Sequence, residues 1–146
     1  DKTNLGIGDY EFSLYSEFGP YQDDTLFEKV AAGDHILYVR DKNNCGVSQL
    51  EVSVVGFPNY FTPNNDGTND SWQFIGVNQK YYTSLVVNIF DRFGKIIAVL
   101  DTHNSNWDGN YNGKQLPEAD YWFDATIINR DGEIKNRKGH FSLIRR

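Results

Sequence analysis

The sequence has little or none of several features that mark other classes of protein. It contains no methionine, one cysteine and four prolines in 146 residues. A transmembrane helix needs about 20 predominantly apolar residues, and no run approaches that length, so we expect a chain that is not itself membrane-spanning. No signal peptide opens the sequence, which begins at Asp1 in the manner of a mature protein. We therefore expect the C-terminal piece of a longer polypeptide.

Catalytic patterns are also absent. The three histidines, His35, His103 and His140, form no H-x-x-x-H or H-E-x-x-H pair, and no G-x-S-x-G elbow is present. Most aspartates stand in expected turns, which is their ordinary place, although a carboxylate pair for glycoside hydrolysis needs only proximity in the fold. On these grounds we predict that the protein is not an enzyme.

Charge is distributed unevenly along the chain, whose formal net charge is −6. Residues 1–56 carry ten acidic and four basic side chains, whereas residues 57–146 carry ten of each. A sequence pI near 4.9 excludes nucleic acid as a partner, because phosphate contacts need a net basic surface. Arg130–Arg146 holds six basic and two acidic residues, which gives this last stretch a charge of +4.

What the sequence does contain favours strands and turns. Aromatic residues make up 15% of the chain, glycine occurs thirteen times, and no stretch combines a helix cap with apolar residues at helical spacing. We predict an all-β protein of antiparallel, immunoglobulin-like β-sandwiches, with one domain at 1–55 and another at 57–146. The boundary is placed at Gly56–Pro58.

In the first domain, strand-like runs recur about every ten residues, as in an immunoglobulin-like sandwich. The expected strands are Tyr10–Tyr15, Leu26–Val30, His35–Arg40 and Gln49–Val55. In the second domain, Asp91–Gly94 is predicted to close a hairpin as a type I turn with a G1 bulge. The expected strands there are Trp72–Ile75, Leu85–Phe90, Lys95–Leu100, Tyr121–Ile128 and Lys138–Ile144. Alternation within the fourth of these directs Tyr121, Phe123, Ala125 and Ile127 inward.

The densest run of turn-forming residues is Phe61–Trp72, which reads FTPNNDGTNDSW. Asn and Asp bond their own backbone and Gly67 supplies positive φ, so we predict a shaped loop. The run meets every fixed position of the F-T-P-N-x-D-G-x-N-D-x-W signature and so resembles the type B C-terminal domain of type IX secretion cargo. That family, also called the gliding-motility-associated C-terminal domain, occurs on surface and secreted proteins of Bacteroidota. Its W-D-G-x-x-x-G-x-x-L-P pattern is met from Trp107 to Pro117, and the resemblance covers Phe57–Arg146.

This resemblance implies that the folded second domain is a sorting signal. It would direct its protein, expected to be a large gliding adhesin, across the outer membrane to the cell surface. The implied partners are an outer-membrane barrel of the PorP/SprF type and the type IX secretion channel, together with the upstream remainder of the same polypeptide. The alternative is an adhesive β-sandwich that binds a glycan or another cell.

The first domain resembles short extracellular repeats of gliding-motility adhesins through Tyr10–Leu14, Phe27–His35 and Val39–Gly46. In such repeats a cysteine at the position of Cys45 pairs with one on an early strand, and this sequence has no second cysteine. The resemblance therefore implies a partial repeat that continues upstream. The alternative is that residues 1–55 complete their core against the second domain.

Four residues of the signature loop are candidate metal ligands, since their spacing is that of an oxygen-rich calcium loop. They are Asn64, Asp66, Asn69 and Asp70. The other interpretation, which we favour, is an Asx-rich turn that satisfies its own amides and needs no cofactor. Similarly, Trp72, Trp107 and Trp122 are expected in the core rather than as a sugar-stacking platform, because few residues bury so much area.

The candidate docking surface combines the turn at Trp107 with the basic last strands. One interpretation is a solvated sheet edge, where Lys and Arg discourage edge-to-edge pairing. The other, which the resemblance supports, is a surface that docks an acidic receptor of the export machinery. Its predicted residues are Trp107, Asp108, Gly109, Lys135, Arg137, Lys138, Phe141, Arg145 and Arg146.

Overall fold

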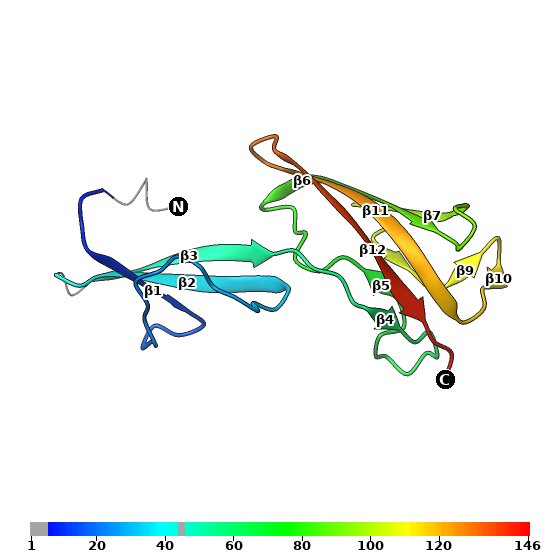
Figure 1. Cartoon of the computed structure of the whole chain (residues 1–146), viewed down its shortest axis with the longest axis horizontal. Helices are drawn as coiled ribbons and strands as arrows, with labels where there is room; N and C mark the ends of the chain where they lie inside the picture. Colours follow the sequence, from blue (N-terminus) through cyan, green and yellow to red (C-terminus); the bar gives the residue numbers. More distant parts are fainter. Residues whose placement is uncertain (1–5, 44–45) are drawn as a thin grey trace. The chain divides into compact units, whose positions relative to one another are not determined.

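The computed structural model describes residues 6–43 and 46–146 and divides the chain into two compact units, Asp1–Val54 and Val55–Arg146. Strands, turns and loops account for all of the described residues (Figure 1), which confirms the all-β prediction. Within this part of the chain, no helix has the length and apolar character needed to cross a membrane.

The first unit is a three-stranded antiparallel sheet in the order β1-β2-β3. The strands are β1 (Tyr10–Leu14), β2 (Gly33–Asp41) and β3 (Val47–Val54). The strand expected at Leu26–Val30 is wrong: this stretch is a loop, in which Lys29 has a φ of 56° and cannot continue a strand. Cys45 lies outside the described residues, so the predictions of a partial repeat and a missing disulfide partner stay predictions.

The second unit is built on a five-stranded sheet in the order β4-β12-β11-β6-β7 (Figure 1). All neighbours are antiparallel except β4 and β12, which pair in parallel. Two short ladders, β5 with β8 and β9 with β10, complete the unit. The bounds are β4 (Tyr60–Phe61), β5 (Trp72–Gln73), β6 (Tyr82–Phe90), β7 (Ile96–Asp101), β8 (Asn106–Trp107), β9 (Asn110–Tyr111), β10 (Lys114–Gln115), β11 (Ala119–Asn129) and β12 (Ile134–Leu143).

The hairpin predicted at Asp91–Gly94 is confirmed. The Gly94 amide donates to the Asp91 carbonyl at 3.0 Å, and Gly94 has a φ of 79°, a value that glycine adopts without strain. Between β6 and β7 the register shifts by one residue at Ile89 and Phe90, as expected for a bulge.

The core of the second unit lies on one face of this sheet. The predicted inward set on β11 is confirmed, and it meets β6 and β12 residues in register, with Phe123 opposite Ile89 and Tyr121 opposite Phe141. Trp72 of β5 and Trp107 of β8 are cross-strand neighbours that cover this face as the second layer. The Trp72 ring stacks on the Phe141 ring at 4.0 Å between centroids.

Trp122 departs from the expectation that all three tryptophans are buried. Its side chain is 43% exposed and lies on the opposite face of the sheet from the core. The reason is the alternation of β11 itself, because Tyr121 and Phe123 both point inward and the residue between them must point outward.

Candidate functional site

The signature loop is held at both ends by buried aromatic side chains. Phe61 and Trp72 are both fully buried, and the Trp72 indole donates to the Pro58 carbonyl at 2.8 Å. Within the loop, the Thr62 amide donates to the Asn69 carbonyl at 2.7 Å, which draws its two sides together. The local sequence thus fixes the loop to the core instead of leaving it as a linker.

The Asp70 carboxylate is the centre of the loop. Its Oδ1 accepts the amides of Asn64 and Asn65 at 3.1 and 2.6 Å, and its Oδ2 accepts the Gly67 amide at 2.8 Å. Positive φ at Asn65, Gly67 and Asn69 turns the backbone so that these amides converge. Such a concave array of N–H groups is an anion site, and here the anion is a side chain of the same loop.

The other proposed metal ligands are also engaged with the loop. Asp66 Oδ1 accepts the Thr68 amide, Asp66 Oδ2 accepts the Asn64 side-chain amide, and Asn64 Oδ1 accepts the Asp66 amide, at 2.8, 2.8 and 3.0 Å. Asn69 acts through its backbone carbonyl. No cluster of three His, Cys, Asp or Glu residues in the described part of the chain is arranged to hold a metal ion. This geometry supports the self-satisfied turn, and calcium binding stays an untested alternative.

The electrostatics of Asp70 follow from these bonds. Desolvation acts to raise the pKa of the carboxyl, but the amides of Gly67, Asn65, Asn64 and Asp66 together outweigh it and hold the pKa below the ordinary 3.8. Because the folded pKa is lower than the unfolded one, the stabilisation is complete above pH 3.8 and is lost as the pH falls through the folded value.

We expect Asp70→Asn to lower the Tm at neutral pH more than Asp66→Asn does, because Asp70 accepts three backbone amides and Asp66 accepts one. The Tm difference between wild type and Asp70→Asn should shrink as the pH falls below 3.8. Thermal melts over an acid pH series measure both effects. Equal Tm losses for the two variants, or a difference independent of pH, would contradict the turn model.

Calcium supplies the matching control for the same melts. With every carboxylate oxygen of the loop already accepting an amide hydrogen, we expect added calcium and added chelator to leave the wild-type Tm unchanged. A Tm that falls on chelation would instead support a bound ion, because a ligand of the native state stabilises it.

A second cluster joins the turn at Gly109 to the last residues of the chain. Gly109 has a φ of 80°, and a Cβ there would lie 2.7 Å from Leu143 Cδ1, so only glycine fits. Its carbonyl accepts the Leu116 amide at 3.0 Å and an Arg145 Nη2 at 3.3 Å. Arg145 Nε donates to the Leu116 carbonyl at 2.9 Å, and the Arg145 amide donates to Glu118. These bonds give a physical reason for the W-D-G and L-P spacing.

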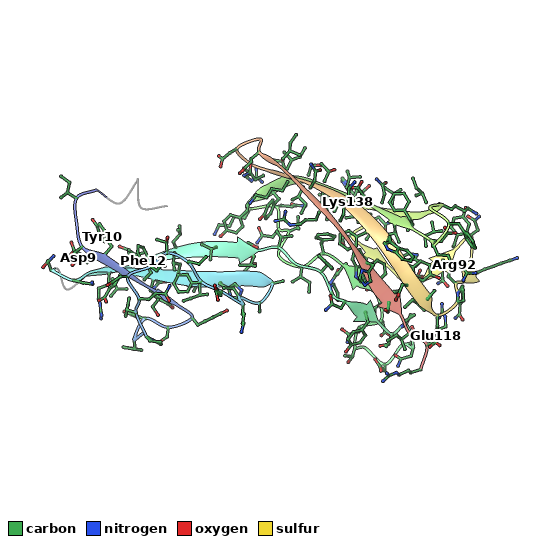
Figure 2. All side chains as sticks on the ribbon, in the orientation of Figure 1. Asp9, Tyr10, Phe12, Arg92, Glu118 and Lys138 are labelled. Carbon is green, nitrogen blue, oxygen red and sulfur yellow. The ribbon has the colours of Figure 1, made fainter. Side chains whose placement is uncertain are left out.

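The structure separates the predicted docking residues into three groups. Trp107 and Phe141 are buried in the core, where they shape the surface from beneath. Asp108, Gly109, Arg145 and Arg146 lie near one end of β12. Lys135, Arg137 and Lys138 lie exposed along β12, where Figure 2 labels Lys138. Arg137 and Arg145 are eight residues apart, which at about 3.3 Å per residue is roughly 26 Å, so they do not form one patch.

Sequence reasoning did not predict the hollows of the second unit, of which the following is one. A cavity of about 400 Å³ is lined by apolar groups of Ile97, Tyr111, Leu116 and Tyr121, with Arg92 and Glu118 (labelled in Figure 2) among its polar residues. Burial raises the pKa of Tyr121, whose hydroxyl donates to the Pro117 carbonyl at 2.9 Å. No local sequence pattern predicts this cavity, because its walls come from the turn between β6 and β7, from β7, β9 and β11, and from the loop before β11.

The carboxylates beside this cavity make structural bonds. Asp91 Oδ1 accepts the amides of Phe93 and Lys95 at 2.9 and 3.0 Å, Glu118 accepts the Arg145 amide, and Asp120 accepts the Ser142 hydroxyl at 2.6 Å. These contacts close turns and join strands. They do not pair two carboxylates as acid and base.

The second unit is therefore a small, aromatic-cored β-module whose polar groups hold its own turns in shape. Residues 55–143 match the model of the CHU_C type IX secretion signal domain, and the chain belongs to this family. It is a family of secretion signals and not of enzymes, and its members are exported across the outer membrane to the cell surface by the type IX system.

The chain is similar to dimeric latent PorU from Porphyromonas gingivalis, with 15% identity and a TM-score of 0.41 over 100% of this chain. It spans 17% of the length of that PorU chain. No curated protein matches the chain.

Proposed function

We propose that the folded second unit is the sorting signal of a large surface protein, a gliding adhesin, and that it is recognised by docking. The receptor is an outer-membrane barrel of the PorP/SprF type acting with the secretion channel. The observation that carries the docking mode is the exposed basic run on β12, where Lys135, Arg137 and Lys138 project from a strand anchored in the core. A rigid, charged surface of this kind suits an acidic partner.

Fusing residues 55–146 to a secreted reporter tests the sorting role. In a strain with a working type IX system, we expect the reporter at the cell surface, and we expect it to stay inside when the PorP/SprF-type barrel is deleted. The double variant Lys135→Glu/Arg137→Glu tests the docking surface, because it reverses two charges of the basic run. It should fold like the wild type and be exported poorly. Surface export that does not need the barrel would contradict the proposed receptor.

The exposed face of the sheet favours a second candidate function. Trp122 has Phe90 and His140 as its cross-strand neighbours, and an open hollow of about 500 Å³ lies over these side chains, with Asp124 and Lys138 at its side. An exposed ring beside polar groups is a surface on which a sugar can stack. Glycan binding by the wild type, lost in Trp122→Ala and unaccompanied by reporter export, would support adhesion instead of sorting.

A further inference from the structure

The strand β12 has one edge without a partner over most of its length. On one side it pairs with β11 from Ile134 to Leu143 without a break in register. On the other side, within the described residues, it pairs only at Ser142 and Leu143, with β4. The segment from Ile134 to His140 therefore presents an open sheet edge, with the Phe57 ring close to Gly139 on its inner face.

The direction of the backbone groups along this edge follows from the hydrogen bonds between β12 and the β4 segment. The Ser142 amide donates to the Asn59 carbonyl at 2.9 Å and the Ile144 amide donates to the Phe61 carbonyl at 3.0 Å, both on the β4 side. Because backbone groups alternate sides along a strand, the even-numbered residues Asn136, Lys138 and His140 also direct their N–H and C=O outward. The Asn136 carbonyl accepts a hydrogen bond from the exposed Arg137 side chain at 3.2 Å, which a partner strand would displace. Arg137 and Gly139 direct theirs toward β11.

Basic side chains flank this edge on both faces of the sheet. Lys138 projects from the outer face, 77% exposed and 3.6 Å from Asp124. Arg137 and Lys135 share the parity of the buried Phe141, so they project from the inner face, beside Ala125 and Ile127 of β11. Both are exposed, and no ion pair involves either of them in the described part of the chain.

We propose that the open edge of β12 binds an extended acidic segment of a partner protein by strand addition. The edge already accepts one strand in this manner, since β4 adds to it in parallel, and a partner strand would continue along the same edge from His140 toward Ile134. Outward backbone groups would supply the ladder of hydrogen bonds, and the three cations would select carboxylates. The proposal rests on the proposed function for the identity of the partner as an export receptor, but binding is tested separately.

Amide exchange on the full 146-residue chain, followed by NMR, provides the test. The probe is a synthetic peptide in which glutamate alternates with threonine and valine. In the free chain, the amides of Asn136 and Lys138 should exchange faster than those of Arg137 and Gly139. Peptide at ten times its Kd should slow exchange at the even positions by about tenfold and leave the odd positions unchanged.

Two altered peptides and two variants separate strand addition from simple attraction. The peptide with lysine for glutamate, and the peptide with alternate amides methylated, should both fail to protect the edge. Lys138→Pro removes an outward N–H and should abolish binding. Lys138→Ala loses the same charge but keeps the N–H, so it should still bind, more weakly than the wild type. Should Lys138→Pro not fold, Lys135→Glu/Arg137→Glu takes its place, with loss of binding expected.

Several outcomes would overturn the proposal. They are the absence of slowed exchange at the even positions at millimolar peptide, equal binding of the methylated peptide, and self-association of the chain through β12 in place of peptide binding. A different result would contradict the proposed function: a wild-type reporter fusion that is not exported. Undiminished export of a Lys138→Pro fusion would overturn only the role of the edge in sorting.

Discussion

Deleting residues 138–146 is expected to abolish export of a reporter fused to the second unit. The deletion removes Phe141 and Leu143, both essentially fully buried, and with them the ring on which Trp72 stacks. Truncating one buried Phe to Ala costs about 3–5 kcal/mol, while a whole domain is stable by only about 5–15 kcal/mol. The shortened unit should not fold, and β11 would be left with an open edge over its core residues.

Surface display of the reporter, measured with protease shaving, checks this expectation. Ser105→Ala is the control, because Ser105 is exposed, lies outside the predicted docking residues, and its truncation leaves the core intact. A deletion variant displayed at the wild-type level would show that the signal is read without the last strand, and it would remove the basis for a folded docking surface.

Trp72→Ala is expected to lower the free energy of unfolding of the second unit by about 3–5 kcal/mol, the usual cost of emptying a large aromatic site. Trp72 is fully buried and contacts the rings of Phe57, Phe74, Phe123 and Phe141. Its indole also donates to Pro58, so the substitution detaches the signature loop from the core. Denaturant unfolding followed by circular dichroism gives the difference directly.

Trp122→Ala provides the matched comparison, since it removes the same side chain from the exposed face of the same sheet. We expect a loss within about 1 kcal/mol, as for surface substitutions away from the core. Losses of equal size at Trp72 and Trp122 would mean that the outer face is covered in solution, contrary to the exposure of Trp122 in this fold.

The parts of the fold that depend on neighbouring residues could be predicted from the sequence. The hairpin at Asp91–Gly94 is one case, because the turn type is set by an aspartate and a glycine three residues apart. The core face of β11 is another, because strict alternation along one strand fixes it. The same alternation already required an outward Trp122, so the general preference of tryptophan for the core was the weaker argument there.

The parts that depend on distant residues could not be predicted. Nothing local in Tyr60–Phe61 indicates that it pairs in parallel with the end of β12, about eighty residues later in the chain. The links from Arg145 to Gly109 and Leu116 likewise join three separate segments. The signature loop lay between these cases: its turn residues indicated a shaped loop, but only the fold shows that Asp70 collects the amides and Asp66 does not.

The place of β12 in the sheet has a consequence for the order in which the unit folds during synthesis. It is the last strand in the chain, yet it lies between β4, the first strand of the unit, and β11. The strands from β4 through β11 therefore leave the ribosome before β12, which lies between β4 and β11 in the sheet. Trp72 has no stacking partner until Phe141 has emerged. The unit, and any surface that depends on its folding, can therefore form only after Leu143 has been synthesised.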